Sequence, residues 1–132
     1  QVGAPREVYE RPVNAFVARF MGHDNLYPIS TRQGGRLTTA LGTLTAEDPG
    51  DGELLLIRPE TLDLLPGKVE GDNHLTAKVA ERLYRGSHAE FRLEIGDTTL
   101  QATVNNRGRH LPEIGETVTV AVAPEDLVTL HE

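Results

Sequence analysis

The apolar residues near the start of the chain recur at the spacing of one helix face. This stripe consists of Val13, Phe16, Val17 and Phe20. Pro5 and Pro12 can each open a short helix, because a proline lacks only an N–H that would have no partner at that position. Gly22 suits the end of a helix. The pattern therefore predicts two short N-terminal helices, over residues 5–10 and 12–22.

After Gly22 the apolar residues fall into short segments separated by Gly, Pro, Asn and Asp, which is typical of a small all-β domain. The clearest hairpin surrounds Gly96 and Asp97, because apolar and polar residues alternate on both sides of this turn. The predicted strands are 25–31, 36–40, 53–58, 75–84, 89–95, 98–104, 117–123 and 127–130. Polar loops at 47–52 and 66–73 are expected to be mobile and exposed.

Two strand ends carry similar sequences, Ile-Arg-Pro-Glu-Thr-Leu at 57–62 and Val-Ala-Pro-Glu-Asp-Leu at 122–127. In each, the proline cannot continue a strand ladder, and the acidic residue suits the start of a single helical turn. This similarity predicts a duplicated β-unit that forms a barrel-like or paired-barrel body. The expected fold class is therefore mainly β, with two short helices in front.

Composition restricts the function further. The 132 residues suffice for one compact domain with a short appendage. Thirteen basic and twenty acidic residues give a net charge of −7, which opposes binding to nucleic acid. The absence of cysteine excludes disulfides and thiolate chemistry. We find no membrane-spanning run and no signal peptide, and a chain that starts with Gln1 reads as a fragment of a longer protein.

Catalytic motifs are weak. The only Gly-Lys pair, Gly67-Lys68, precedes a valine and lacks the glycine spacing of a phosphate-binding loop. Ser87 lacks a nucleophile elbow. No two histidines have the spacing of a helical zinc site, although His74, His88 and His110 could meet across strands in a metal-dependent enzyme. We expect no catalytic residue, no cofactor site and no metal site in this chain.

Two groups of residues are candidate contact sites. Tyr9, Phe16 and Phe20 form an apolar set that either packs as core or docks on a neighbour, and dimerisation would cover it. Asn105, Arg107 and Arg109 lie in a polar loop that is either a solvated turn or a grip for an anion or a phosphate backbone.

Longer motifs resemble a known family. Residues 1–22 match the pattern Q-x-G-x-P-x-x-x-Y-x-x-P-x-x-x-F-V-A-x-F-x-G. This pattern resembles the segment that follows the nucleotide-binding domain in ATP-binding subunits of ABC importers. The segments Asn25-Leu26, 57–60, Tyr84-x-Gly86-Ser87 and 115–127 resemble the C-terminal TOBE region of the same subunits. The resemblance is strongest for importers of iron(III), polyamines, and sulfate or sugars, and iron(III) is our guess for the cargo.

The resemblance implies a helical connector at 1–22 and an OB-like TOBE domain at 23–132, which regulates transport and pairs subunits. It implies a homodimer attached to its nucleotide-binding domain and to permease subunits, at the cytoplasmic face of the cell membrane. ATP and Mg²⁺ would bind before residue 1. The alternative is a free-standing OB-like module that binds a ligand or nucleic acid through Arg107 and Arg109.

Overall fold

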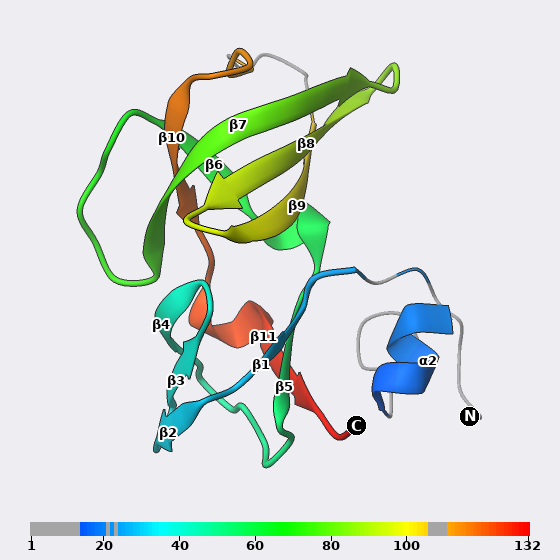
Figure 1. Cartoon of the computed structure of the whole chain (residues 1–132), viewed down its shortest axis with the longest axis vertical. Coiled ribbons are helices and arrows are strands. Elements are labelled where there is room, and N and C mark those ends of the chain that lie inside the picture. Colours follow the sequence, from blue (N-terminus) through cyan, green and yellow to red (C-terminus); the bar gives the residue numbers. More distant parts are fainter. Residues whose placement is uncertain (1–13, 21, 23, 106–110) are drawn as a thin grey trace. The chain divides into compact units, whose positions relative to one another are not determined.

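The computed structural model describes residues 14–20, 22, 24–105 and 111–132, and strands predominate among them (Figure 1). The contacts divide the chain into two compact units. Unit 1 takes in the described residues up to Arg58 together with Pro124–Glu132, and unit 2 is Pro59–Ala123. No helix in the described ranges is long and apolar enough to cross a membrane.

Unit 1 is built around a strand that is buried along its whole length. This strand, β5 (Leu54–Ile57), is a continuous apolar run and lies between β1 (Leu26–Pro28) and β11 (Leu127–Leu130) in an antiparallel three-stranded sheet. The helix α2 (Ala15–Phe20) packs on this sheet through Ala18. A second antiparallel sheet consists of β2 (Thr31–Gln33), β3 (Arg36–Thr39) and β4 (Gly42–Thr45).

Unit 2 is a curled five-stranded antiparallel sheet (Figure 1). Its order is β6 (Asp63–Pro66), β10 (Thr117–Ala121), β7 (His74–Tyr84), β8 (His88–Ile95) and β9 (Thr98–Asn105). The hairpin turn at Gly96-Asp97 joins β8 to β9, as predicted. The strands direct alternate apolar side chains inward, among them Phe91, Leu93 and Leu100, each with no exposed surface.

The two Pro-Glu segments adopt the same local structure. Each proline begins a 3₁₀ turn, η1 at Pro59–Thr61 and η2 at Pro124–Asp126, and each turn is followed by a strand. The strands around the two turns pair with each other: β5 with β11 in unit 1, and β6 with β10 in unit 2. Arg58, which precedes η1, and Asp126, the last residue of η2, approach to 3.6 Å in a partly buried ion pair.

The mainly β prediction is confirmed, and the curled sheet is consistent with an OB-like fold. The expectation of two N-terminal helices is not confirmed. The first helix lies outside the described residues, and α2 is a six-residue helix, much shorter than 12–22. The predicted strand at 25–31 is also wrong in extent: β1 ends at Pro28, and a separate β2 begins at Thr31.

Candidate functional site

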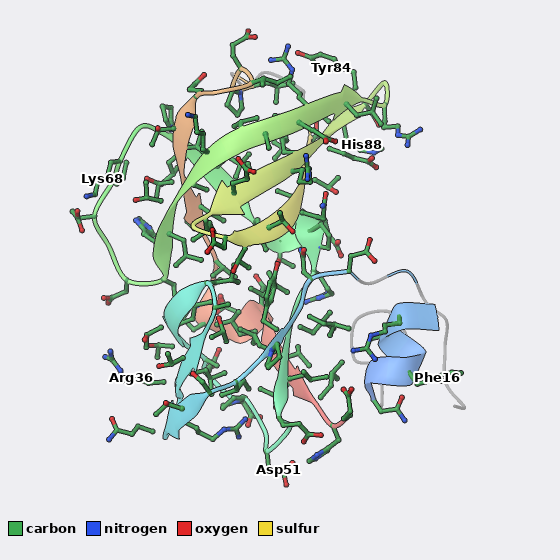
Figure 2. All side chains as sticks on the ribbon, viewed as in Figure 1. Phe16, Arg36, Asp51, Lys68, Tyr84 and His88 are labelled. Atoms are coloured by element: carbon green, nitrogen blue, oxygen red, sulfur yellow. The ribbon has the colours of Figure 1, made fainter. Side chains whose placement is uncertain are left out.

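Helix α2 presents a different face to the sheet than the sequence predicted. Ala18 is fully buried against Leu56 and Leu130, whereas Phe16 is 75% exposed and projects from the helix (Figure 2). The interpretation of Phe16 as core is therefore wrong, and its side chain is open to a neighbour. Tyr9 lies outside the described residues, as does the side chain of Phe20.

The start of α2 is tied to the end of the chain. Asn14 forms a parallel β-bridge with His131, and Arg19 lies 3.9 Å from the Glu132 carboxylate. The imidazole of His131 lies between two carboxylates: Nε2 is 2.9 Å from Asp51 Oδ1, and Nδ1 is 3.0 Å from Glu53 Oε2. This cluster fastens the last residues to the loop before β5, where Figure 2 labels Asp51.

The hydrogen bonds in this cluster stabilise the charged forms of His131, Asp51 and Glu53. The hydrogen bonds to Asp51 and Glu53 raise the pKa of His131 above its usual range. The hydrogen bond to His131 in turn lowers the pKa of Asp51, and the Glu132 backbone N–H lowers that of Glu53. Because the two carboxylates bond to opposite ring nitrogens, the arrangement favours an imidazolium rather than a metal ligand.

A second group of exposed apolar side chains lies at the end of the β7–β8 hairpin in unit 2. Leu83 is 50% exposed and Tyr84 54%, and Ile114 is 64% exposed on the loop before β10. Leu83 and Ile114 line a hollow of about 380 Å³, together with residues that include Arg82 and Arg92. Figure 2 shows Tyr84 and His88 together at this end of the hairpin.

Both signs of charge surround these apolar residues. Arg92 forms an ion pair with Glu81, and Arg85 lies 3.4 Å from Glu90, to which His88 also comes within 3.6 Å. These pairs bring cations and carboxylates onto the same part of the β7–β8 hairpin. The hairpin end is therefore an apolar patch with mixed charge, a composition that suits contact with another protein surface.

The side chain of Arg82, near the end of β7, contacts three groups next to this patch. Arg82 donates to the Pro112 carbonyl at 2.9 Å, lies 3.2 Å from Glu113, and stands 5.0 Å from the centre of the Tyr84 ring. This patch is not among the contact sites predicted from the sequence. A local signal was present, because apolar and polar residues stop alternating after Val79 and two large apolar residues end the strand side by side.

The structure describes little of the predicted polar loop. Asn105 is the exposed last residue of β9, while Arg107 and Arg109 lie outside the described residues. His74 and His88 begin β7 and β8, so they lie at opposite ends of an antiparallel pair, and His110 is outside the described residues. Among described residues, no three His, Asp or Glu side chains are grouped to hold a metal ion.

The described residues form a small domain of antiparallel β-sheets with exposed apolar residues. Comparison with known proteins identifies the family of this domain. The TOBE domain model matches residues 55–130, which is more than half of the chain. The chain belongs to the TOBE domain family.

The curated relatives are ATP-binding proteins of import systems. The chain is 32% identical over 142 residues to a protein of Borreliella afzelii named spermidine/putrescine import ATP-binding protein PotA, covering all of this chain and 37% of the relative. It is 34% identical over 132 residues to the Fe(3+) ions import ATP-binding protein FbpC of Streptomyces avermitilis, covering 98% of this chain and 37% of the relative. The chain therefore spans just over a third of these relatives.

A solved structure shares the fold. The cytoplasmic molybdate-binding protein ModG, in a crystal form with molybdate bound, superposes with a TM-score of 0.62 at 13% identity, covering 80% of this chain and 94% of that one. At this identity the likeness concerns the fold alone.

Proposed function

We propose that this chain is the regulatory and dimerisation domain of the ATP-binding subunit of an ABC importer, and that it performs no catalysis itself. One observation carries the proposal: the TOBE match lies within a similarity to import ATP-binding proteins that extends over almost the whole chain. The similarity covers only 37% of these relatives, which leaves most of their length for ATP chemistry outside the aligned part.

The exposed helix face fits this arrangement. Phe16 is an unusual residue to leave in water, because burying a phenylalanine side chain contributes about 1.5–3 kcal/mol. We place the nucleotide-binding domain of the same subunit, which would precede residue 1, against Phe16. That domain would hold ATP and Mg²⁺ and contact the permease at the cytoplasmic face of the membrane. The domain described here would carry no cofactor and would pair two subunits.

We further propose that the cargo is a cation. Relatives are named for Fe(3+) and for spermidine and putrescine, and iron(III) is the more specific expectation from the sequence. Uptake of radiolabelled iron and of spermidine into vesicles that hold the complete importer would decide between them. If the vesicles took up neither iron nor spermidine, that result would contradict the proposal that the cargo is a cation.

The regulatory role can be tested by cutting the full subunit. A subunit that lacks residues 24–132 should still hydrolyse ATP when assembled with its permease, and its rate should no longer respond to cargo added on the cytoplasmic side. The 132-residue chain alone should hydrolyse no more ATP than buffer does. ATP turnover by the isolated chain, or an unchanged cargo response in the truncated subunit, would refute the proposal.

The alternative of a nucleic-acid-binding module makes a different prediction. Phosphate contacts release counterions, so such binding would weaken steeply with salt. We expect no salt-dependent binding of single-stranded DNA by this chain, whose net charge is −7. Binding that is lost between low and physiological salt, and that disappears in Arg107→Ala/Arg109→Ala, would favour the alternative.

A further inference from the structure

Within the described ranges, strand β7 is paired on both sides only along its first half. Lys78 is the last residue of β7 that pairs with β10. Beside it, Val79 donates to the Glu116 carbonyl at 3.0 Å and accepts from the Gly115 N–H at 2.8 Å. From Glu81 to Tyr84, β8 is the only pairing partner of β7 among the described residues. Among the residues that the structure describes, the second half of β7 therefore has no partner strand on its other side and forms an open edge.

The register of the hairpin shows which backbone groups face this edge. At the turn, Arg85 donates to the His88 carbonyl at 2.8 Å, which makes these two a hydrogen-bonded pair. Hydrogen-bonded and non-hydrogen-bonded pairs alternate along an antiparallel ladder. Leu83 is then bonded to Glu90, and the N–H and C=O groups of Arg82 and Tyr84 point away from β8. An open row of this kind is a template for another strand.

We propose that this edge, residues Glu81–Arg85, pairs antiparallel with the same edge of a second copy of the chain. The inference rests on the dimerisation proposed above and assigns the surface that carries it. A two-fold axis through Leu83 sets Arg82 opposite Tyr84 of the second copy, and Tyr84 opposite its Arg82. These are the residues whose backbone groups face outward, so both pairs become hydrogen-bonded pairs and together exchange four backbone hydrogen bonds.

The side chains along the edge complement themselves in this register. Glu81 comes opposite Arg85 of the second copy, and each of these side chains keeps more than half of its surface exposed in its own ion pair. Leu83 meets Leu83, which shields an apolar residue that is half exposed in the single chain. Opposite charges and apolar pairs across a two-fold stabilise neighbouring strands.

This self-complementarity favours a second copy over a foreign peptide. A chain with a net charge of −7 repels its own copies on average, so a lasting contact needs a locally balanced surface. The edge supplies one such surface, because Glu81 and Arg85 carry opposite charges and Arg82 is paired with Glu113 at 3.2 Å. The hollow beside Leu83 and Ile114 leaves room next to the edge for the side chains of the partner strand.

A single cysteine tests the register directly, because the chain contains no cysteine. In the proposed dimer, residue 83 forms a non-hydrogen-bonded pair with its copy, and such pairs bring Cα atoms to about 4.5 Å, within the range of a disulfide. Leu83→Cys should give a covalent dimer under mild oxidation. The matched control is Asp97→Cys, which carries an exposed thiol at the other end of β8 and should stay monomeric on a non-reducing gel.

Charge exchange tests the pairing without a covalent bond. Glu81→Arg alone and Arg85→Glu alone each put like charges opposite each other twice per dimer, and either change should weaken the dimer about tenfold in sedimentation equilibrium. The double variant Glu81→Arg/Arg85→Glu restores opposite charges and should recover the affinity to within about threefold. Circular dichroism of each variant should match the unmodified chain.

The outcomes separate this inference from the dimerisation on which it rests. A monomeric unmodified chain across micromolar concentrations would overturn both. A dimer in which Leu83→Cys crosslinks no better than Asp97→Cys, or in which the charge exchange restores nothing, would overturn the β7 edge alone. A crosslink at residue 83 together with recovery in the double variant would support it.

Discussion

A buried hydroxyl makes two hydrogen bonds to the long loop between β6 and β7. Thr119, on β10, is 1% exposed. Its Oγ1 accepts from the Val69 N–H at 2.8 Å and donates to the Gly67 carbonyl at 2.7 Å. Thr119→Val keeps the shape of the side chain and removes both bonds. We therefore expect this substitution to loosen the loop, which keeps the bond from the Gly67 N–H to the Thr117 carbonyl, without disturbing the sheet.

The size of the effect follows from the two bonds. Each intramolecular hydrogen bond contributes a net ~0.5–1.5 kcal/mol, so their loss should lower the free energy of unfolding by about 1–3 kcal/mol. With a urea slope of about 2 kcal/mol/M, a loss of about 2 kcal/mol moves the unfolding midpoint down by about 1 M. The Val69 amide, which loses its acceptor, should also exchange its hydrogen faster.

A matched control lies directly across the strand pair. Thr76, on β7, is the register partner of Thr119 but is exposed. Thr76→Val removes the same chemical group and should change the stability by less than about 0.5 kcal/mol. The measurements are urea unfolding and hydrogen exchange of both variants. If Thr119→Val were no less stable than Thr76→Val, the hydroxyl would not be what holds the loop.

Three other predictions follow from the geometry. A Cβ added at Gly52 would overlap backbone atoms of Leu130, so Gly52→Ala should cost about 1–3 kcal/mol in thermal or urea unfolding, and a neutral result would contradict the packing of β11. The raised pKa of His131 means that its stabilising effect is complete below about pH 6.5, the unfolded value, and is lost as the pH rises through the folded value. His131→Gln should therefore lower the unfolding midpoint more at pH 6 than at pH 9, and an equal loss at both would argue against the ion pairs. Ala18→Asp should destabilise the chain because Ala18 is fully buried, whereas Phe16→Asp should leave urea unfolding of the chain unchanged and weaken its attachment to the preceding domain, which limited proteolysis of the full subunit would report.

Local patterns in the sequence were sufficient to predict the long strands. The alternation around Gly96-Asp97 corresponds closely to β8 and β9, because one face of each strand is buried and a two-residue turn fixes the register. The similarity between the two Pro-Glu segments likewise anticipated two 3₁₀ turns, since proline and a following acidic residue act through local geometry.

The short strands and the helix face could not be predicted in the same way. β2 has no buried side chain, and β6 is a four-residue strand that ends in Pro66, so neither shows the alternation of buried and exposed residues that marks a longer strand. The stripe through Phe16 suggested the buried face of α2, but the small Ala18 is the residue that allows close approach to Leu56.

The contacts at the candidate sites depend on distant parts of the chain. His131 meets Asp51 and Glu53, which lie near the middle of the sequence, and no local pattern predicts that meeting. The loop at 47–52, which the sequence predicted to be mobile, is held by side chains from elsewhere. Arg32 donates to the carbonyls of Gly50 and Gly52, and the Thr129 hydroxyl donates to that of Pro49.

The chain leaves unit 1 after β5 and re-enters it just before β11, and these two strands are neighbours. Ile57 and Leu127 are partners in their ladder, so the exit and the return are separated by about the 4.5–5.5 Å of paired strands. Pro59–Ala123 is thus an insertion between β5 and β11, two strands that would otherwise form a simple antiparallel hairpin. Such a cassette can be exchanged, shortened or duplicated over evolution at two adjacent joints, while the strands that receive it keep their partners.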